Sequence, residues 1–453
     1  MTESARQPDG DVIPLGEATK AWFAISLQTF GGPAGQIAVM QHKLVDEKRW
    51  IGQQRFLHAL NYCMLLPGPE AQQLAVYTGW LLNGRRGGLI AGVLFVLPGM
   101  AALLALSALY VGAGSTTVVA GLFAGLAPAV IAIVIQAVYR VGKRALHHAV
   151  LVGLAVASFL ALTVFGVPVP AVVLVAGLLG WLMARRIPSM RAAKAHEVDD
   201  GPAPLISDDA LHHDTPSSGR SLRILALGLI LWFTPVLVAG LIFSRDSVYV
   251  DQGLFFSGAA VVTFGGAYAV LAYVADQAVN VYGWLAPGEM VRGLALAEST
   301  PGPLIMVVQF VAFVGAYRDP GSLDPWVAAV IASLLVTWVT FVPCFLFVFL
   351  GAPYVERLRS NEQLAAALTG ITAAVVGVIA NLAVFFALNT LFDETRRVAW
   401  GVAGLDIPVF ASWDPLAFAL TGLALALLFW RGWSPLRTLG VCAVLGLVIT
   451  PLL

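Results

Sequence analysis

Thr-Phe-Gly-Gly at 29–32 recurs at 263–266, 234 residues further along the chain. Pro-Gly-Pro at 67–69 recurs at 301–303 with the same offset. Over the 41 aligned positions 29–69, eleven residues are identical, whereas unrelated sequence of this composition would give roughly three. The chain is therefore an internal duplication, and both of its contiguous matches contain glycine or proline.

The composition predicts a membrane protein. Of the 453 residues, 59% are hydrophobic and 11% are charged, whereas a soluble protein carries about 25% charged residues. Apolar runs at 89–110, 118–138, 326–350 and 365–388 reach or exceed the ~20 residues that a transmembrane helix needs. We expect an all-α polytopic membrane protein, because a β-barrel would show alternating segments of about ten residues.

Charge, cysteines and missing motifs argue against other classes. The net charge is zero and there is no basic tract for nucleic acid. Cys63, Cys344 and Cys442 are scattered through apolar stretches and predict packed thiols rather than disulfides or a metal site. The first twenty residues lack the apolar core of a signal peptide. Phosphate-loop, HExxH and GxSxG motifs are absent, so we expect neither enzyme nor cofactor.

The duplication and the polar segments predict the organisation of the chain. The expected units are an N-terminal tail (1–16), a first repeat (17–186), a cytoplasmic linker (187–220), an extra transmembrane helix (221–243) and a second repeat (251–453). The linker is rich in Pro, Ser, Asp and His, which is typical of a disordered loop in water. A metal site is the alternative for His196, His212 and His213.

Positive charges predict the orientation. In the first half, Arg/Lys clusters at 85–86, 140–144 and 185–186 are separated by pairs of apolar helices, and the loops between carry no charge. The positive-inside rule places the clusters in the cytoplasm. The unpaired segment 221–243 then carries the chain across the membrane. We therefore expect inverted repeats with broken helices or hairpins and about 13 transmembrane segments.

Pro-Gly-Pro breaks a helix within each repeat. Trp50–Leu66 and Glu70–Leu82 are each too short to span, at roughly 20–25 Å for 1.5 Å per residue. Pro69 lacks an N–H, and Pro67 disfavours the α conformation at the residue before it. Two half-helices are therefore expected to meet inside the membrane. Free N–H groups and the positive dipole end of the second half-helix would suit an anion.

Inverted repeats would bring the two breaks together near the midplane. Because both breaks occur in register beside a glycine break, a binding site is favoured over kinks for helix packing, which are the alternative. The candidate substrate-binding residues are Gly31, Gly32, Pro67, Gly68, Pro69, Gly265, Gly266, Ser299, Thr300, Pro301, Gly302 and Pro303.

Two charged residues near the second break are further candidates. Glu298 is costly inside a membrane and would repel an anion, so we expect it to carry a proton or pair with a cation; a structural hydrogen bond is the alternative. Arg292 could hold an oxyanion through its planar guanidinium, or snorkel to lipid headgroups. Other polar residues near the breaks are Gln28, Gln36, Asn61, Glu70, Gln72, Gln73 and Gln309.

The ordered motifs resemble the chromate ion transporter family. They are Phe-Gly-Gly-Pro at 30–33, the segment 45–50 and Leu-Pro-Gly-Pro at 66–69, followed in the second half by 264–266, 283–284 and 299–303. Since both halves are covered, the chain resembles the long, two-repeat form. It departs from the family pattern at Gln36, where a histidine is expected, and at Ala267, which replaces a frequent third glycine.

The resemblance implies a secondary transporter in the cytoplasmic (inner) membrane that exports chromate and gives resistance. Similar proteins are also linked to sulfate, a tetrahedral dianion of nearly the same shape. Moving one charge is worth ~2.3 kcal/mol per 100 mV, so a dianion gains about twice that when it leaves a negative interior. A proton-coupled sulfate importer using Glu298 is the alternative, and a membrane enzyme or scaffold is a remote one. The expected partners are the oxyanion and lipid, and a homodimer is left open.

Overall fold

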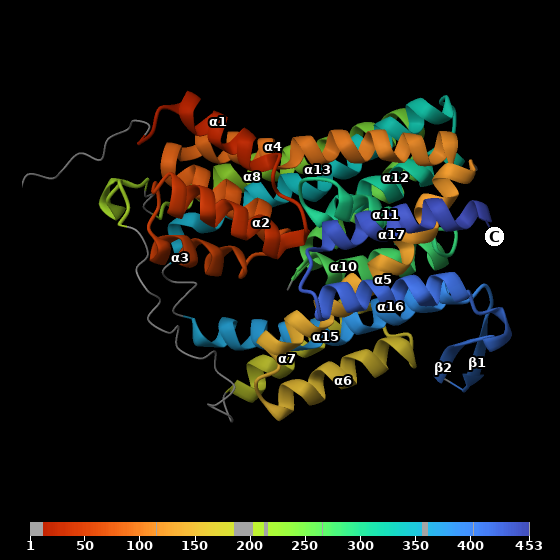
Figure 1. Ribbon diagram of the computed structural model, residues 1–453. Coiled ribbons are helices and arrows are strands. Elements are labelled where there is room, and N and C mark those ends of the chain that lie inside the picture. Colours follow the sequence, from red (N-terminus) through yellow and green to blue (C-terminus); the bar gives the residue numbers. More distant parts are fainter. Residues whose placement is uncertain are drawn as a thin grey trace, which may run out of the picture.

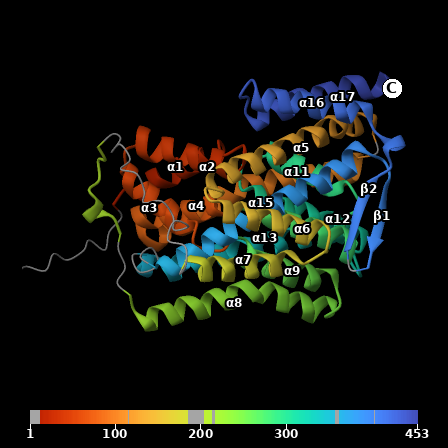
Figure 2. The same cartoon turned by 90° about the horizontal axis from the view of Figure 1, so that it is seen from below.

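The structure, a computed structural model, describes residues 12–114, 116–184, 203–212, 216–264, 266–355, 361–401 and 403–452. Its helices lie roughly along one common direction, and loops gather at the two ends of the bundle (Figure 1). In the view from below, α8 (Ser218–Phe243) runs along one edge, and α16 (Pro415–Phe429) and α17 (Pro435–Ile449) run along the opposite edge (Figure 2).

The remaining helices of the first half follow one another along the chain. They are α1 (Leu15–Ser26), α2 (Gly32–Gln41), the π-helical turn η1 (His42–Glu47), α3 (Gln53–Cys63), α4 (Glu70–Ala113), α5 (Thr117–Ala145), α6 (Ala149–Thr163) and α7 (Val169–Ala184).

The second half, after the short turn η3 (Asp208–Ala210) and α8, repeats much of this order. Its further elements are α9 (Val248–Val262), α10 (Ala267–Asp276), η4 (Gln277–Val281), α11 (Glu289–Ser299), η5 (Leu304–Met306), α12 (Val307–Arg318), α13 (Pro325–Gly351), η6 (Ala352–Tyr354), α15 (Glu362–Leu391), η7 (Phe410–Ser412) and η8 (Thr450–Leu452).

Helix α4 is a hairpin rather than one straight rod. Asn83 and Gly84 have non-helical backbone angles, and Gly84 takes the positive φ of 57° that glycine tolerates. Beyond this turn the chain folds back on itself. Gly79, before the turn, lies so close to Ala91, after it, that a Cβ on Gly79 would be 2.6 Å from the Cβ of Ala91. The segment from Glu70 is therefore a short helix of its own, as the sequence predicts.

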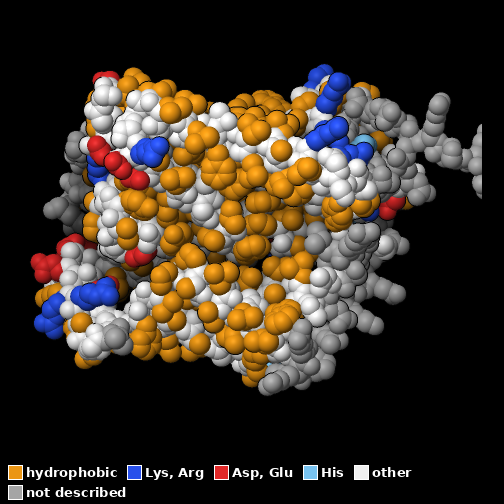
Figure 3. Space-filling view, turned by 180° about the vertical axis from the view of Figure 1, so that it is seen from behind, with side chains coloured by type: hydrophobic (Ala, Val, Ile, Leu, Met, Phe, Trp, Pro, Cys, Tyr) orange, Lys and Arg blue, Asp and Glu red, His pale blue; other side chains and the backbone are white. Residues whose placement is uncertain are grey.

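Within the described ranges, six helices are long and apolar enough to cross a membrane. They are Glu70–Ala113, Thr117–Ala145, Ser218–Phe243, Pro325–Tyr354, Gln363–Leu391 and Pro435–Leu452. Hydrophobic side chains cover the middle of the face seen in Figure 3, whereas charged side chains gather toward its two ends. A surface of this kind is matched to a bilayer. The protein is a multi-pass membrane protein, as its composition predicts.

Two matched tryptophans lie at opposite ends of the long arm of α4. Near Trp50, the N–H of Leu205 donates to the Arg49 carbonyl at 2.7 Å, and the linker there also meets the turn of α4. Near Trp284, the hydroxyl of Tyr110, at the far end of α4, donates to Glu289 at 2.8 Å. About 26 helical residues separate Gly84 from Tyr110, which is roughly 40 Å.

The described part of the linker is held in place rather than disordered. The N–H of His212 donates to the Leu81 carbonyl at 2.8 Å, and Arg49 donates to the carbonyl of Ala203. Leu211 is 3% exposed. The prediction of disorder is wrong for 203–212, because these apolar and main-chain contacts anchor the segment. His196 and His213 lie outside the described residues.

A small β-hairpin departs from the all-α prediction. Strands β1 (Thr395–Trp400) and β2 (Ala403–Pro408) pair antiparallel, with Trp400 opposite Ala403. Val398, Trp400 and Ile407 favour extended backbone, and Gly401 takes a φ of 61° in the turn. The hairpin is short and charged, with Arg396, Arg397 and Asp406 in its two strands, so the sequence carries no clear strand pattern there.

The two halves are interleaved. Gly125 on α5 meets the Cys442 carbonyl on α17, so a helix of the first half packs closely on one of the second. Conversely, Gly370 on α15 meets the Ala176 carbonyl on α7. Small residues permit this close approach between membrane helices. The halves therefore form a single unit around the breaks.

Candidate functional site

The two Pro-Gly-Pro breaks are joined to the opposite halves by crossed hydrogen bonds. The N–H of Gly68 donates to the Thr263 carbonyl at 2.8 Å, and the N–H of Gly302 donates to the Thr29 carbonyl at 3.0 Å. Each Pro-Gly-Pro thus contacts the glycine break of the other repeat. All four breaks meet at one place inside the bundle.

The backbone at this place depends on glycine. Gly68 and Gly302 take φ values of 122° and 101°, and Gly31 and Gly266 take 80° and 106°. Side chains disfavour such angles, whereas glycine adopts them readily. Pro69 and Pro303 then fix φ at the start of the next helix. The repeated motifs therefore encode the sharp turns at which the chain changes direction inside the bundle.

A small cavity lies where the breaks meet. Its volume is about 10 Å³, close to the space of one water. It is lined by Pro33, Gln36, Pro69, Glu70, Ala71, Gly266, Ala267, Pro303, Leu304 and Ile305. Eight of these ten form four pairs at the offset of 234, namely Pro33 with Ala267, Pro69 with Pro303, Glu70 with Leu304 and Ala71 with Ile305. The two repeats thus line the cavity with equivalent residues.

Two helix N-termini face this cavity. One is the start of α4 at Glu70, and the other is the start of η5, which continues as α12. N–H groups in the first turn of a helix lack acceptors within it, and the helix dipole adds partial positive charge there. The Gly68 and Gly302 amides donate to the carbonyls of Thr263 and Thr29, so the donors that a ligand could use here are those of the first helical turns. The arrangement suits a small anion.

Buried glutamines surround the breaks with unsatisfied polar atoms. Gln36 is 1% exposed, and its Nε2 donates to the Gly302 carbonyl at 2.5 Å while its Oε1 has no partner among the described residues. The Oε1 atoms of Gln73 and Gln309 and both amide atoms of Gln72 are likewise unpartnered in the described chain. An unpaired buried polar atom costs about 1–3 kcal/mol. The site therefore has buried amide atoms that could still form hydrogen bonds with a ligand or water.

A family model described as chromate transporter matches residues 16–181 and 250–447, which is most of the chain and includes all four breaks. The chain belongs to the chromate transporter family. It is 33% identical to a chromate transport protein of Pseudomonas aeruginosa over 372 residues, covering 79% of this chain and 77% of that protein.

Two further relatives are similar over nearly their whole length. A chromate transport protein of Cupriavidus metallidurans is 28% identical over 426 residues, which is 94% of this chain and 90% of the relative. A probable chromate transport protein of Synechococcus elongatus is 25% identical over 423 residues, which is 92% and 96% of the two chains. No solved structure matches the chain significantly.

In this chromate transporter, Glu298 lies beside the cavity rather than in its lining. It is 2% exposed, and its Oε1 accepts a hydrogen bond from the Tyr268 hydroxyl at 2.5 Å. Its Oε2 is buried without a partner among the described residues. The Tyr268 hydroxyl lies 3.8 Å from the position that a Cβ on Gly32 would occupy. Tyr268 thus connects Glu298 to the first glycine break.

The other predicted residues fall into three groups. Pro69, Gly266 and Pro303 line the cavity. The hydroxyls of Ser299 and Thr300 donate to carbonyls one turn back in α11, at 2.8 and 3.0 Å. The third group belongs to the breaks themselves, next to residues that line the cavity: Gly31, Gly32, Pro67, Gly68, Pro301 and Gly302. Gly265 lies outside the described residues.

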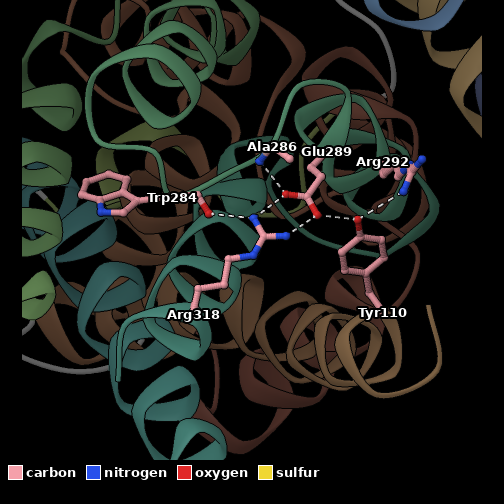
Figure 4. Close-up of polar contacts among 6 residues, drawn as sticks. All are labelled: Tyr110, Trp284, Ala286, Glu289, Arg292 and Arg318. Carbon is pink, nitrogen blue, oxygen red and sulfur yellow. Dashed lines mark hydrogen bonds and ion pairs between the residues drawn. The ribbon is translucent and has the colours of Figure 1, made fainter. Parts of the chain in front are cut away.

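Arg292 belongs to a separate polar network at one end of the bundle. Its guanidinium donates to the Tyr110 hydroxyl at 3.4 Å, and Tyr110 in turn donates to Glu289 (Figure 4). Glu289 forms a bidentate pair with Arg318. Arg292 is absent from the lining of the central cavity. The structure thus separates it from the breaks, with which the sequence analysis grouped it.

Sequence reasoning missed the residues that the breaks pack against. Thr29 and Thr263 were matched as a pair but not recognised as acceptors of the crossed bonds. Gly68 packs on Cys344 of α13, and Gly302 packs on Gly99 of α4. Downstream of the breaks the repeats match at an offset of 245, as Pro98 with Pro343 and Gly125 with Gly370 show, and at this offset position 99 is equivalent to position 344. The alignment of the two repeats could therefore have predicted that the two Pro-Gly-Pro breaks make equivalent contacts.

Proposed function

We propose that the protein is a secondary transporter that exports chromate across the inner membrane and thereby gives chromate resistance. The observation that carries this proposal is the cavity at which two helix N-termini, one from each half, meet beside crossed hydrogen bonds. Partial positive charge from both ends favours a dianion. Relatives named chromate transport proteins, similar over most of the chain, support chromate as that dianion.

The two halves act, in this proposal, as inverted repeats with about 13 transmembrane segments in all. The opposite positions of Trp50 and Trp284 along α4 support it. The hairpins around the two Pro-Gly-Pro breaks also support it, because in inverted repeats they would enter the membrane from opposite faces. Transport then proceeds by alternating access, with one repeat rocking against the other around the shared cavity.

The cavity must widen for a tetrahedral oxyanion to enter. With a volume of about 10 Å³ it holds about one water. The conformation described here is therefore closed around the site. Opening to the cytoplasm would admit the dianion and opening to the outside would release it. An inside-negative potential favours release by roughly 4–5 kcal/mol per dianion at 100 mV, without a nucleotide.

A proton-coupled sulfate transporter is the second candidate. Sulfate has the shape and charge of chromate, so the same helix ends would hold it. The buried carboxyl of Glu298, bonded to the Tyr268 hydroxyl, favours this candidate because an intramembrane carboxyl can carry a proton. The two candidates differ in the driving force and in the direction of flux.

Flux in proteoliposomes tests the proposal. We expect an inside-negative potassium diffusion potential to drive chromate out of loaded vesicles without a pH gradient, because the dianion moves down the electrical gradient. Vesicles without protein are the control for leakage. A strict requirement for an inward proton gradient, lost in Glu298→Gln, would instead establish the sulfate importer. Chromate flux that ignores the membrane potential would contradict charge-driven export.

The inverted arrangement predicts opposite accessibility for two repeat partners, Asp46 and Asn280. Both side chains are exposed, and they are equivalent at the offset of 234. In a background with the three buried cysteines replaced by alanine, an impermeant maleimide added to intact cells should label Asn280→Cys and spare Asp46→Cys. Permeabilised cells should show labelling of both. Equal labelling in intact cells would rule out inversion.

A further inference from the structure

The cavity contains an ionisable side chain that the proposed transport cycle has not used. Of its ten lining residues, Glu70 is the only one with a titratable group. The equivalent position in the second repeat is Leu304, so the carboxyl enters from one half only. Glu70 stands in the first turn of α4. It is therefore at one of the two helix ends that would hold an anion.

No cation in the described part of the chain pairs with this carboxyl. Among the described residues, Glu70 has neither an ion pair nor a side-chain hydrogen bond. Helix α2 and the turn η5, which pack around the start of α4, carry no ionisable side chain. Cys63 of α3 is close enough to interact with Glu70 electrostatically, and α13 contributes the thiol of Cys344 behind Gly68.

The second repeat brings the other titratable groups of this region. They are the hydroxyl of Tyr268 on α10 and the carboxyl of Glu298 on α11, which bond to each other beside the cavity. Helix α3 also carries Arg55 and His58 in its first half, more than one turn before Cys63. Arg140 of α5 interacts electrostatically with both Tyr268 and Glu298, so a cation lies near that pair. The ten residues that line the cavity include no cation, and the positive potential within the lining comes from the helix ends.

We propose that Glu70 couples oxyanion binding to proton uptake, so that the cavity accepts a dianion when Glu70 is protonated. An ionised carboxylate and a dianion would compete for the same two helix N-termini and repel each other in a site with little water. Protonation removes this repulsion, and the carboxyl O–H can then donate to an oxyanion oxygen. The proton comes from solvent and returns to it when the anion leaves. The inference rests on the proposed function, because it requires an oxyanion in this cavity.

The coupling between proton binding and anion binding determines how the oxyanion affinity changes with pH. If one proton is bound with each dianion, affinity is highest at low pH and falls as pH rises, by up to about tenfold per pH unit. Chromate itself takes up a proton near neutrality, which would confuse the measurement. Sulfate remains a dianion there. Radiolabelled sulfate is therefore the probe, with chromate as a competitor.

The experiment measures sulfate binding to the purified full-length protein in lipid nanodiscs from about pH 5.5 to pH 8, a range over which sulfate stays a dianion and carboxyl groups in proteins can titrate. We expect affinity to fall with pH in the wild type and to be independent of pH in Glu70→Gln, which keeps the size and a donor. Glu70→Asp should retain the pH dependence. Glu17→Gln is the matched control, because Glu17 is an exposed glutamate on α1.

The outcomes separate the inference from the function beneath it. If Glu70→Gln keeps the wild-type pH slope, Glu70 is not the coupling group, and the oxyanion site survives. If the wild type binds neither sulfate nor chromate at any pH, the proposed function itself fails. A Glu70→Gln protein that does not elute as a folded species is replaced by Glu70→Asp, for which loss of the slope would overturn the inference.

Discussion

Replacing Gly302 with leucine is expected to abolish oxyanion transport while the protein still inserts into the membrane. Gly302 has a φ of 101°, and a Cβ there would lie 3.2 Å from the Cα of Gly99 and 3.6 Å from the Phe95 carbonyl. A non-glycine residue at such an angle costs about 1–2 kcal/mol, and overpacking costs about 1–3 kcal/mol more. The break would shift away from α4 and from Thr29. We expect flux per inserted molecule to fall at least ~100-fold, equivalent to about 2.7 kcal/mol.

The first repeat offers an equivalent variant and a matched control. A Cβ on Gly68 would lie 2.8 Å from Nε2 of Gln73 and 2.9 Å from Sγ of Cys344, so Gly68→Leu should behave like Gly302→Leu. Gly432 also has a positive φ, of 63°, but open space around it. Gly432→Leu therefore tests backbone strain without disturbing a break and should keep flux. Wild-type flux in both Gly68→Leu and Gly302→Leu would remove the paired breaks from the mechanism.

The sequence alone predicts the breaks because proline and glycine act locally. Pro69 and Gly68 determine the backbone within a few residues, whatever surrounds them. The hydrogen bond from Gln36 to the Gly302 carbonyl joins residues 266 positions apart and has no local signature. The same is true of the crossed bonds to Thr29 and Thr263. The duplication implies that the breaks are equivalent, but the contacts between them depend on tertiary packing.

The choice between two carboxyls shows a similar limit. Glu298 lies within an apolar segment, which predicts a functional role for its carboxyl. Glu70 follows a proline, and an acid at the start of a helix is common because it interacts favourably with the helix dipole. Which of them faces the cavity depends on the rotation of each half-helix about its axis. The structure places Glu70 in the lining and Glu298 behind Tyr268.

Arg292 was grouped with the breaks by sequence proximity. Nine residues separate it from Pro301, and at 1.5 Å per residue this is about 13 Å along a helix. That length carries Arg292 to the far end of α11, where Tyr110 and Glu289 lie (Figure 4). A distance along a helix could have been worked out from the sequence, but the partners at that end could not.

The same network carries the largest expected effect on stability. Glu289 is 7% exposed and accepts two hydrogen bonds from Arg318, at 2.7 and 2.9 Å, with one more each from the Ala286 N–H and the Tyr110 hydroxyl. Arg318 also donates to the Trp284 carbonyl at 3.3 Å. The pair therefore fastens the loop before α11 to the end of α12, and with it the hairpin that carries the second Pro-Gly-Pro.

Arg318→Met should lower the free energy of unfolding by about 1–3 kcal/mol, because it leaves a buried carboxylate without its cation. The side chain of Arg318 is 45% exposed, which keeps the effect below that of a fully buried pair. Thermal denaturation in detergent measures the change, and Glu289→Gln combined with Arg318→Met should recover part of it, since no charge is then left unpaired. The control is Arg397→Met in the β-hairpin, whose contact with Asp406 is 3.8 Å long and exposed on both sides. Equal melting temperatures for Arg318→Met and Arg397→Met would show that the network does not hold the hairpin in place.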